Sequence, residues 1–125
     1  MPAETLNLTI ALGHLLLGGA FVYAGVRNVR SIPVLTQVIG ARGVPQARLV
    51  LIAGIALQIV CGALLVAGLW TSAAAMGLIA FLLAATLLFH NFWDHAGLDR
   101  SNRINGVISN IALAGAFILV IAAAR

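Results

Sequence analysis

Residues 77–85 read GLIAFLLAA, a stretch without a single charged side chain. A membrane-spanning β-strand requires alternating apolar and polar residues, and this stretch is apolar on every side. It lies within a longer apolar run, 72–93, and about 20 apolar residues are enough for a helix to cross roughly 30 Å of hydrocarbon. The pattern therefore predicts a transmembrane helix over 72–93.

Three more windows are long and apolar enough to cross a bilayer, namely 6–26, 49–70 and 104–124. The chain has 125 residues, of which 62% are hydrophobic and 8% charged. A soluble domain carries about 25% charged residues, so this composition excludes a soluble enzyme, a disordered tail and a disulfide scaffold. We expect residues 1–125 to form a single all-α transmembrane domain, an antiparallel four-helix bundle.

The connections between these spans differ in length. Residues 70–72 leave room only for a minimal turn, so the second and third spans should be antiparallel neighbours. Segment 28–48 is longer, and Pro33 suits the first turn of a helix. A short amphipathic helix at the membrane interface is predicted there from the spacing of Ile32, Leu35, Val38 and Ile39.

Segment 94–103 is polar and is predicted to be a loop, with Ser101 or Asn102 as the N-cap of the last helix. Arginines border this segment and segment 28–48, whereas the opposite face has only Arg125. Because Lys and Arg concentrate in cytoplasmic loops, we expect both segments in the cytoplasm and both termini outside. The net positive charge of the chain then reflects its orientation in the membrane, and we expect no nucleic acid partner.

Polar side chains within the spans are few, and each is a candidate for function because polar groups are costly in hydrocarbon. His14 and Gln58 are the candidates nearest mid-membrane. Glycine and alanine share helix faces with Gln58 and Asn110, and small residues let helices approach closely. The competing interpretation for Gln58, Thr86 and Asn110 is therefore a structural one, hydrogen bonding between helices.

A second group of polar side chains falls at the cytoplasmic ends of the predicted helices. Such a group can form the mouth of a ligand site, or its members can satisfy one another near the lipid headgroups. We expect Arg27 to pair with Asp94 or with carbonyl groups at a helix end. The candidate ligand-binding residues are Tyr23, Arg27, His90, Asn91 and Asn110.

Several cofactor chemistries fit this inventory poorly. Counting 1.5 Å per residue, His14 lies about 13 Å and His90 about 27 Å from the outer ends of their helices, which disfavours a bis-histidine haem. Cys61 is the only cysteine, so a dithiol centre or an iron–sulfur cluster is not expected. The group of His90, Asp94, His95 and Asp99 matches no metal-ligand spacing, and we expect no metal site.

Several short motifs follow one another along the chain: YAGVRN (23–28), GARGVP (40–45), QIVCGALLVAG followed by LWT (58–71), HNFW (90–93) and NIALAG (110–115). Together they resemble the DoxX family of small bacterial membrane proteins. The resemblance implies a four-helix transmembrane bundle in the bacterial inner membrane. It also implies a link to quinone-coupled sulfur or thiol oxidation, or to membrane complexes with redox partners.

The chain departs from the pattern of this family at three positions. Many relatives carry Glu in place of Gln58, Lys in place of Asn28 and Lys in place of Ser109. Losing the mid-membrane carboxylate removes the best proton-handling group, which favours a structural or partner-anchoring role over catalysis. Whether the chain has any enzymatic activity stays open.

The leading hypothesis is a DoxX-like accessory subunit in a lipid bilayer, which docks a redox-enzyme partner and holds a quinone or a lipid near His90, Tyr23 and Arg27. Quinone carbonyls accept hydrogen bonds from His, Tyr and Asn within an apolar slot. No other cofactor is expected. The alternatives are a structural assembly protein without a ligand and a small-molecule transporter, which would need a homo-oligomer because four packed helices leave no polar lumen.

Overall fold

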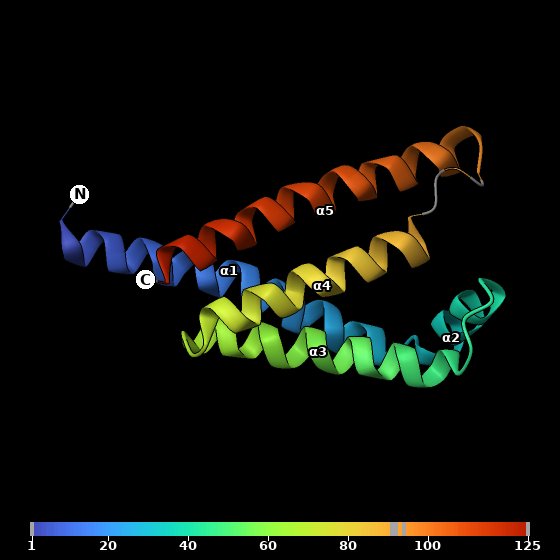
Figure 1. Ribbon diagram of the computed structural model, residues 1–125, viewed down its shortest axis with the longest axis horizontal. Helices are drawn as coiled ribbons and strands as arrows, with labels where there is room; N and C mark the ends of the chain where they lie inside the picture. Colours follow the sequence, from blue (N-terminus) through green and yellow to red (C-terminus); the bar gives the residue numbers. More distant parts are fainter. Residues whose placement is uncertain (1, 91–92, 94, 125) are drawn as a thin grey trace.

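The computed structural model describes residues 2–90, 93 and 95–124, and its secondary-structure elements over this part of the chain are all helical (Figure 1). In chain order the elements are α1 (Ala3–Val29), α2 (Ile32–Ala41), α3 (Ala47–Ala67), α4 (Thr71–Phe89) and α5 (Gly97–Ala123).

Four of these helices, α1, α3, α4 and α5, are long and apolar enough to cross a membrane. The prediction of an all-α, four-span membrane protein is therefore confirmed. Both ends of the chain lie at one end of the molecule, while α2, the end of α4 and the beginning of α5 lie at the other (Figure 1). We call this second end the α2 end.

The predicted loop at 94–103 is wrong over most of its length. α5 begins at Gly97, and its N-cap is Ala96 instead of Ser101 or Asn102. The polarity of this stretch suggested a loop, but it marks the first turns of a helix that extends beyond its apolar part.

Charge placement explains why these polar turns are helical. Asp99 lies in the first turn of α5, where the positive end of the helix dipole stabilises an anion. Arg103 follows one turn later, and its Nε donates a hydrogen bond to Oδ1 of Asp99 at 3.3 Å. Pairs of opposite charge at this spacing stabilise helices.

The four long helices pack in chain order across the molecule. α1 packs along α3, α3 against α4, and α4 against α5 (Figure 1). Three aromatic rings join α1, α4 and α5: the Phe21 centroid lies 5.4 Å from that of Phe117 and 6.2 Å from that of Phe81. Both pairs meet edge to face, the arrangement that aromatic rings prefer.

The crossing of α1 and α3 is unusually close because glycine lies on both helices. A Cβ atom built on Gly18 would lie 2.5 Å from the carbonyl oxygen of Gly62, and a Cβ on Gly62 would lie 2.8 Å from the carbonyl oxygen of Gly18. Small residues at a membrane helix crossing allow such backbone contact. This contact fixes how α1 lies against α3.

The predicted short helix after the first span is confirmed as α2, with Pro33 in its first turn. Ile39 of α2 is only 1% exposed, and it packs in a small core with Leu51 and Ile55 of α3. α2 therefore covers the beginning of α3 at the α2 end.

Candidate functional site

A cavity of about 300 Å³ lies between α2, α3 and α4, close to the α2 end. We call it the α2 pocket. Most of its lining is apolar, as in most small-molecule sites in proteins. The lining residues are Asn28, Leu35, Ile39, Val50, Leu51, Gly54, Ile55, Phe81, Ala84, Ala85, Leu88, Phe89 and His90.

Two of the lining side chains, Asn28 and His90, carry hydrogen-bonding groups. Asn28 is in the last turn of α1, and His90 directly follows α4. The backbone angles of His90, φ −113° and ψ 39°, end the helix there. Two helix ends therefore bring both polar groups to the α2 end of an otherwise apolar cavity.

Behind the pocket wall, Asn28 is held by Gln58 of α3. The Asn28 Nδ2 donates a hydrogen bond to the Gln58 Oε1 at 3.3 Å. Gln58 is 3% exposed, and its neighbour Ile59 can pack closely against α1 because Gly25 has no side chain: a Cβ atom built on Gly25 would lie 2.5 Å from Cγ1 of Ile59. The predicted interhelical hydrogen bond for Gln58 is confirmed, and it orients the Asn28 amide at the pocket.

The His90 ring packs against α5 at Gly106. A Cβ atom built on Gly106 would overlap the imidazole ring, so glycine makes this approach of ring to backbone possible. His90 lies just beyond the span formed by α4, and its pKa is lowered from the ordinary value by burial and by the nearby charge of Arg103. The lowered pKa favours the neutral imidazole, which both donates and accepts a hydrogen bond.

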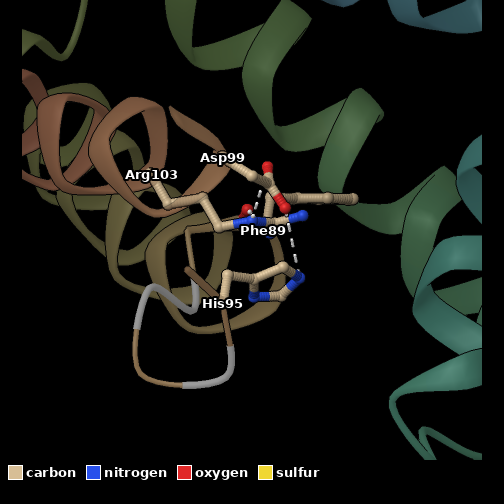
Figure 2. Close-up of polar contacts among 4 residues, drawn as sticks. All are labelled: Phe89, His95, Asp99 and Arg103. Carbon is tan, nitrogen blue, oxygen red and sulfur yellow. Dashed lines mark hydrogen bonds and ion pairs between the residues drawn. The ribbon is translucent and has the colours of Figure 1, made fainter. Parts of the chain in front are cut away.

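A line of polar contacts connects α5 to the end of α4 (Figure 2). The Arg103 Nη1 donates a hydrogen bond to the carbonyl oxygen of Phe89 at 2.6 Å, and the Asp99 carboxylate accepts from the Arg103 Nε. The other oxygen of Asp99, Oδ2, lies 3.6 Å from Nε2 of His95. Arg103 thus holds the last carbonyl group of α4, next to His90.

A second arginine holds α4 from the opposite side. The Arg42 Nη2, at the end of α2, donates a hydrogen bond to the carbonyl oxygen of Leu87 at 3.1 Å. The last carbonyl groups of a helix lack partners within it and carry the negative end of its dipole, so cations stabilise them. Arg42 and Arg103 together fix the segment of α4 that lines the α2 pocket.

Replacing Arg103 by alanine is expected to lower the free energy of unfolding by about 1–2 kcal/mol, because a charge-assisted hydrogen bond to the end of α4 is lost. The matched control is Arg48→Ala, which removes an exposed arginine from the first turn of α3, where a cation gains nothing from the helix dipole. Thermal unfolding in mild detergent measures both variants. Equal transition temperatures for the two would contradict this role of Arg103.

The structure separates the other candidate ligand-binding residues from the α2 pocket. Tyr23 is 71% exposed, and Arg27 is exposed one turn later on the same helix. Neither lines the pocket. Asn91 and Asp94 lie outside the described residues, and the expected pairing of Arg27 with Asp94 therefore stays a prediction.

Asn110 and His14 also lie away from the α2 pocket. The Asn110 Nδ2 donates a hydrogen bond to Oγ1 of Thr86 at 2.8 Å, which joins α5 to α4 and confirms the predicted interhelical bond. His14 is half-buried in the first half of α1, away from the α2 end. Within the described part of the chain, no three His, Cys, Asp or Glu side chains come together as metal ligands would.

Sequence reasoning missed Asn28 as a site residue. One signal was present: Asn28 and Gln58 are two of the three positions at which the chain departs from the DoxX pattern, and the structure joins them by a hydrogen bond. An amide pair thus occupies positions where a Lys–Glu pair would be expected from the resemblance. Two linked departures indicate a contact, and this contact would have placed Asn28 beside Gln58.

These features define a small multi-pass membrane protein of the all-α class, with an apolar pocket at one end of its helices. The sequence profile of the DoxX family matches residues 9–91, so the chain belongs to the DoxX family. The matched segment contains every residue that lines the α2 pocket. No curated protein and no solved structure matches the chain significantly.

Proposed function

We propose that this DoxX protein is an accessory subunit of a redox system, which holds a quinone or a lipid in the α2 pocket and docks a redox-enzyme partner. The α2 pocket carries the first part of this proposal. Its walls are apolar, its volume is about 300 Å³, and its two polar side chains, Asn28 and His90, lie at one end. Ligand sites typically combine a mostly apolar lining with a few polar groups that orient the ligand.

The polar groups of the α2 pocket suit a ligand with carbonyl oxygens. The neutral imidazole of His90 can donate one hydrogen bond, and the Asn28 amide has a second N–H besides the one that it donates to Gln58. An apolar tail can lie along α3 and α4, where Gly54 and Ala84 leave space. This arrangement supports binding, and among the described residues the pocket lining includes no carboxylate and no thiol.

A redox-enzyme partner is proposed to dock at the α2 end. Six arginines belong to the segments near this end, and the positive-inside rule places such segments in the cytoplasm. The α2 pocket then lies near the cytoplasmic side of the inner membrane, with both termini periplasmic. A ligand held there would be within reach of an enzyme bound to the cytoplasmic face.

A structural assembly role is the second candidate, because two pairs of polar side chains join neighbouring helices by hydrogen bonds. Asn28 pairs with Gln58, and Asn110 pairs with Thr86. Hydrogen bonds of this kind stabilise contacts between membrane helices without any ligand. The two candidates differ in whether a small molecule remains bound after purification.

Ligand retention in His90→Ala distinguishes these candidates. The variant is expected to retain about fivefold less co-purified quinone or lipid per folded protein, the loss that one hydrogen bond of about 1 kcal/mol would cause. Mass spectrometry of extracts from protein purified in mild detergent measures the retained molecules. His14→Ala, which removes a histidine far from the pocket, is the control and should retain the wild-type amount. Equal retention in His90→Ala and wild type would contradict ligand binding beside His90.

A further inference from the structure

The walls of the α2 pocket include no side chain that carries a fixed charge among the described residues. The polar groups are the amide of Asn28 and the imidazole of His90. Yet the pocket lies at the end of the protein where arginines are concentrated. The kind of ligand that the pocket binds therefore depends on whether the neighbouring arginines place their guanidinium groups in the pocket or bond to other groups of the protein.

Two arginines that contact the pocket-lining end of α4 donate to groups within the protein. The Arg42 Nη2 donates to the Leu87 carbonyl oxygen at 3.1 Å, and the Arg103 Nη1 donates to the Phe89 carbonyl oxygen at 2.6 Å. Arg103 also pairs with the Asp99 carboxylate. Neither arginine lines the pocket.

The Asn28–Gln58 pair also brings no charge to the pocket wall. Gln58 is 3% exposed, and its Oε1 accepts from the Asn28 Nδ2 at 3.3 Å. This hydrogen bond fixes the orientation of the Asn28 amide at the pocket. An ionised head group entering such a cavity would lose its water without gaining an opposite charge, which is costly.

We infer that the α2 pocket selects small amphiphiles with an uncharged, carbonyl-bearing head and rejects anionic ones, with Gln58 as the positioning residue that keeps the Asn28 amide in place. This inference rests on the proposed function, that the pocket holds a ligand. It goes further by excluding anionic phospholipids and fatty acids from the ligands that the pocket takes. The uncharged wall, not the arginine-rich end, then sets the specificity.

Competition between two matched probes tests this inference. Purified protein in mild detergent at pH 8 binds tritium-labelled decyl-benzoquinone, and either methyl dodecanoate or the dodecanoate ion is added as the competitor. These competitors share one chain and differ at the head in a methyl group and a charge. Partition of each competitor into empty micelles is measured separately, so that its concentration in the micelle is known. The comparison of the two competitors on the wild-type protein then does not depend on the variants. The ester is expected to displace the quinone at about tenfold lower concentration in the micelle than the carboxylate.

Two variants change the charge of the pocket wall. Asn28→Lys places a cation beside Gln58 and is expected to reverse the preference toward the carboxylate. Asn28→Lys with Gln58→Glu adds a counter-charge to the lysine, and the preference for the ester is expected to return. Gln58→Leu keeps the wall neutral but releases Asn28, and we expect about fivefold weaker quinone binding with an unchanged preference between the competitors.

The results separate this inference from the proposed function. Displacement of the quinone by dodecanoate as readily as by the ester would overturn the selection of an uncharged head, while the proposed ligand binding would stand. Absence of quinone binding to the wild-type protein would overturn both. Stronger displacement by the ester than by the carboxylate supports the inference, and its reversal in Asn28→Lys assigns the selection to this wall.

Discussion

Gly18→Leu is expected to prevent stable packing of α1 on α3, with a loss of about 3 kcal/mol or more in the free energy of unfolding. A Cβ atom at this position would lie 2.5 Å from the carbonyl oxygen of Gly62 and 2.8 Å from Cγ2 of Val66. Overpacking a core costs about 1–3 kcal/mol when side chains can adjust. Here the nearest obstacle is backbone, so the helices must separate and lose their contact.

The adjacent glycine provides a control for this substitution. A Cβ atom built on Gly19 has nothing within 4 Å, so Gly19→Leu should unfold near the wild-type temperature. Gly18→Leu should unfold at least about 10 °C lower. Thermal unfolding of the purified proteins in one detergent, followed by circular dichroism, makes the comparison. A transition temperature of Gly18→Leu equal to that of Gly19→Leu would contradict the close crossing.

The four spans and the short α2 helix could be predicted from the sequence because apolar length and the position of proline are local signals. The start of α5 could not. Residues 97–103 are polar, and in a membrane protein polarity suggests a loop, whereas helix-stabilising charges such as Asp99 extend α5 beyond its apolar part. Hydropathy therefore located the membrane segments better than it located the helix ends.

The candidate site could be predicted only in part because hydropathy does not say which way each helix face points. Tyr23 and Arg27 lie one turn apart on one face of α1, and that face points away from the other helices. His90 was a candidate from its position at the end of a span, and it does line the α2 pocket. The part that α2 plays in closing the pocket depends on the contact of Ile39 with α3, which is a tertiary contact without a local signal.

Gly54→Leu is expected to weaken binding of decyl-benzoquinone at least about tenfold, because the new side chain occupies the α2 pocket. Gly54 lines the pocket, and a Cβ atom built there meets only Cε1 of Phe81, at 3.8 Å, which is ordinary contact. The leucine is therefore accommodated without backbone strain, and unfolding should stay near that of the wild type. Gly13→Leu is the matched control: a Cβ atom there has nothing within 4 Å, and binding should be unchanged.

Photolabelling with an azido derivative of decyl-benzoquinone, followed by mass spectrometry of the peptides, tests the site most directly, because it reports where the ligand lies. The label is expected within residues 50–55 of α3 and residues 81–90 at the end of α4, the two segments that contain most of the lining residues of the α2 pocket. It should be lost in Gly54→Leu and kept in Gly13→Leu. Label concentrated on the Tyr23 face of α1, or label undiminished in Gly54→Leu, would contradict the α2 pocket as the ligand site.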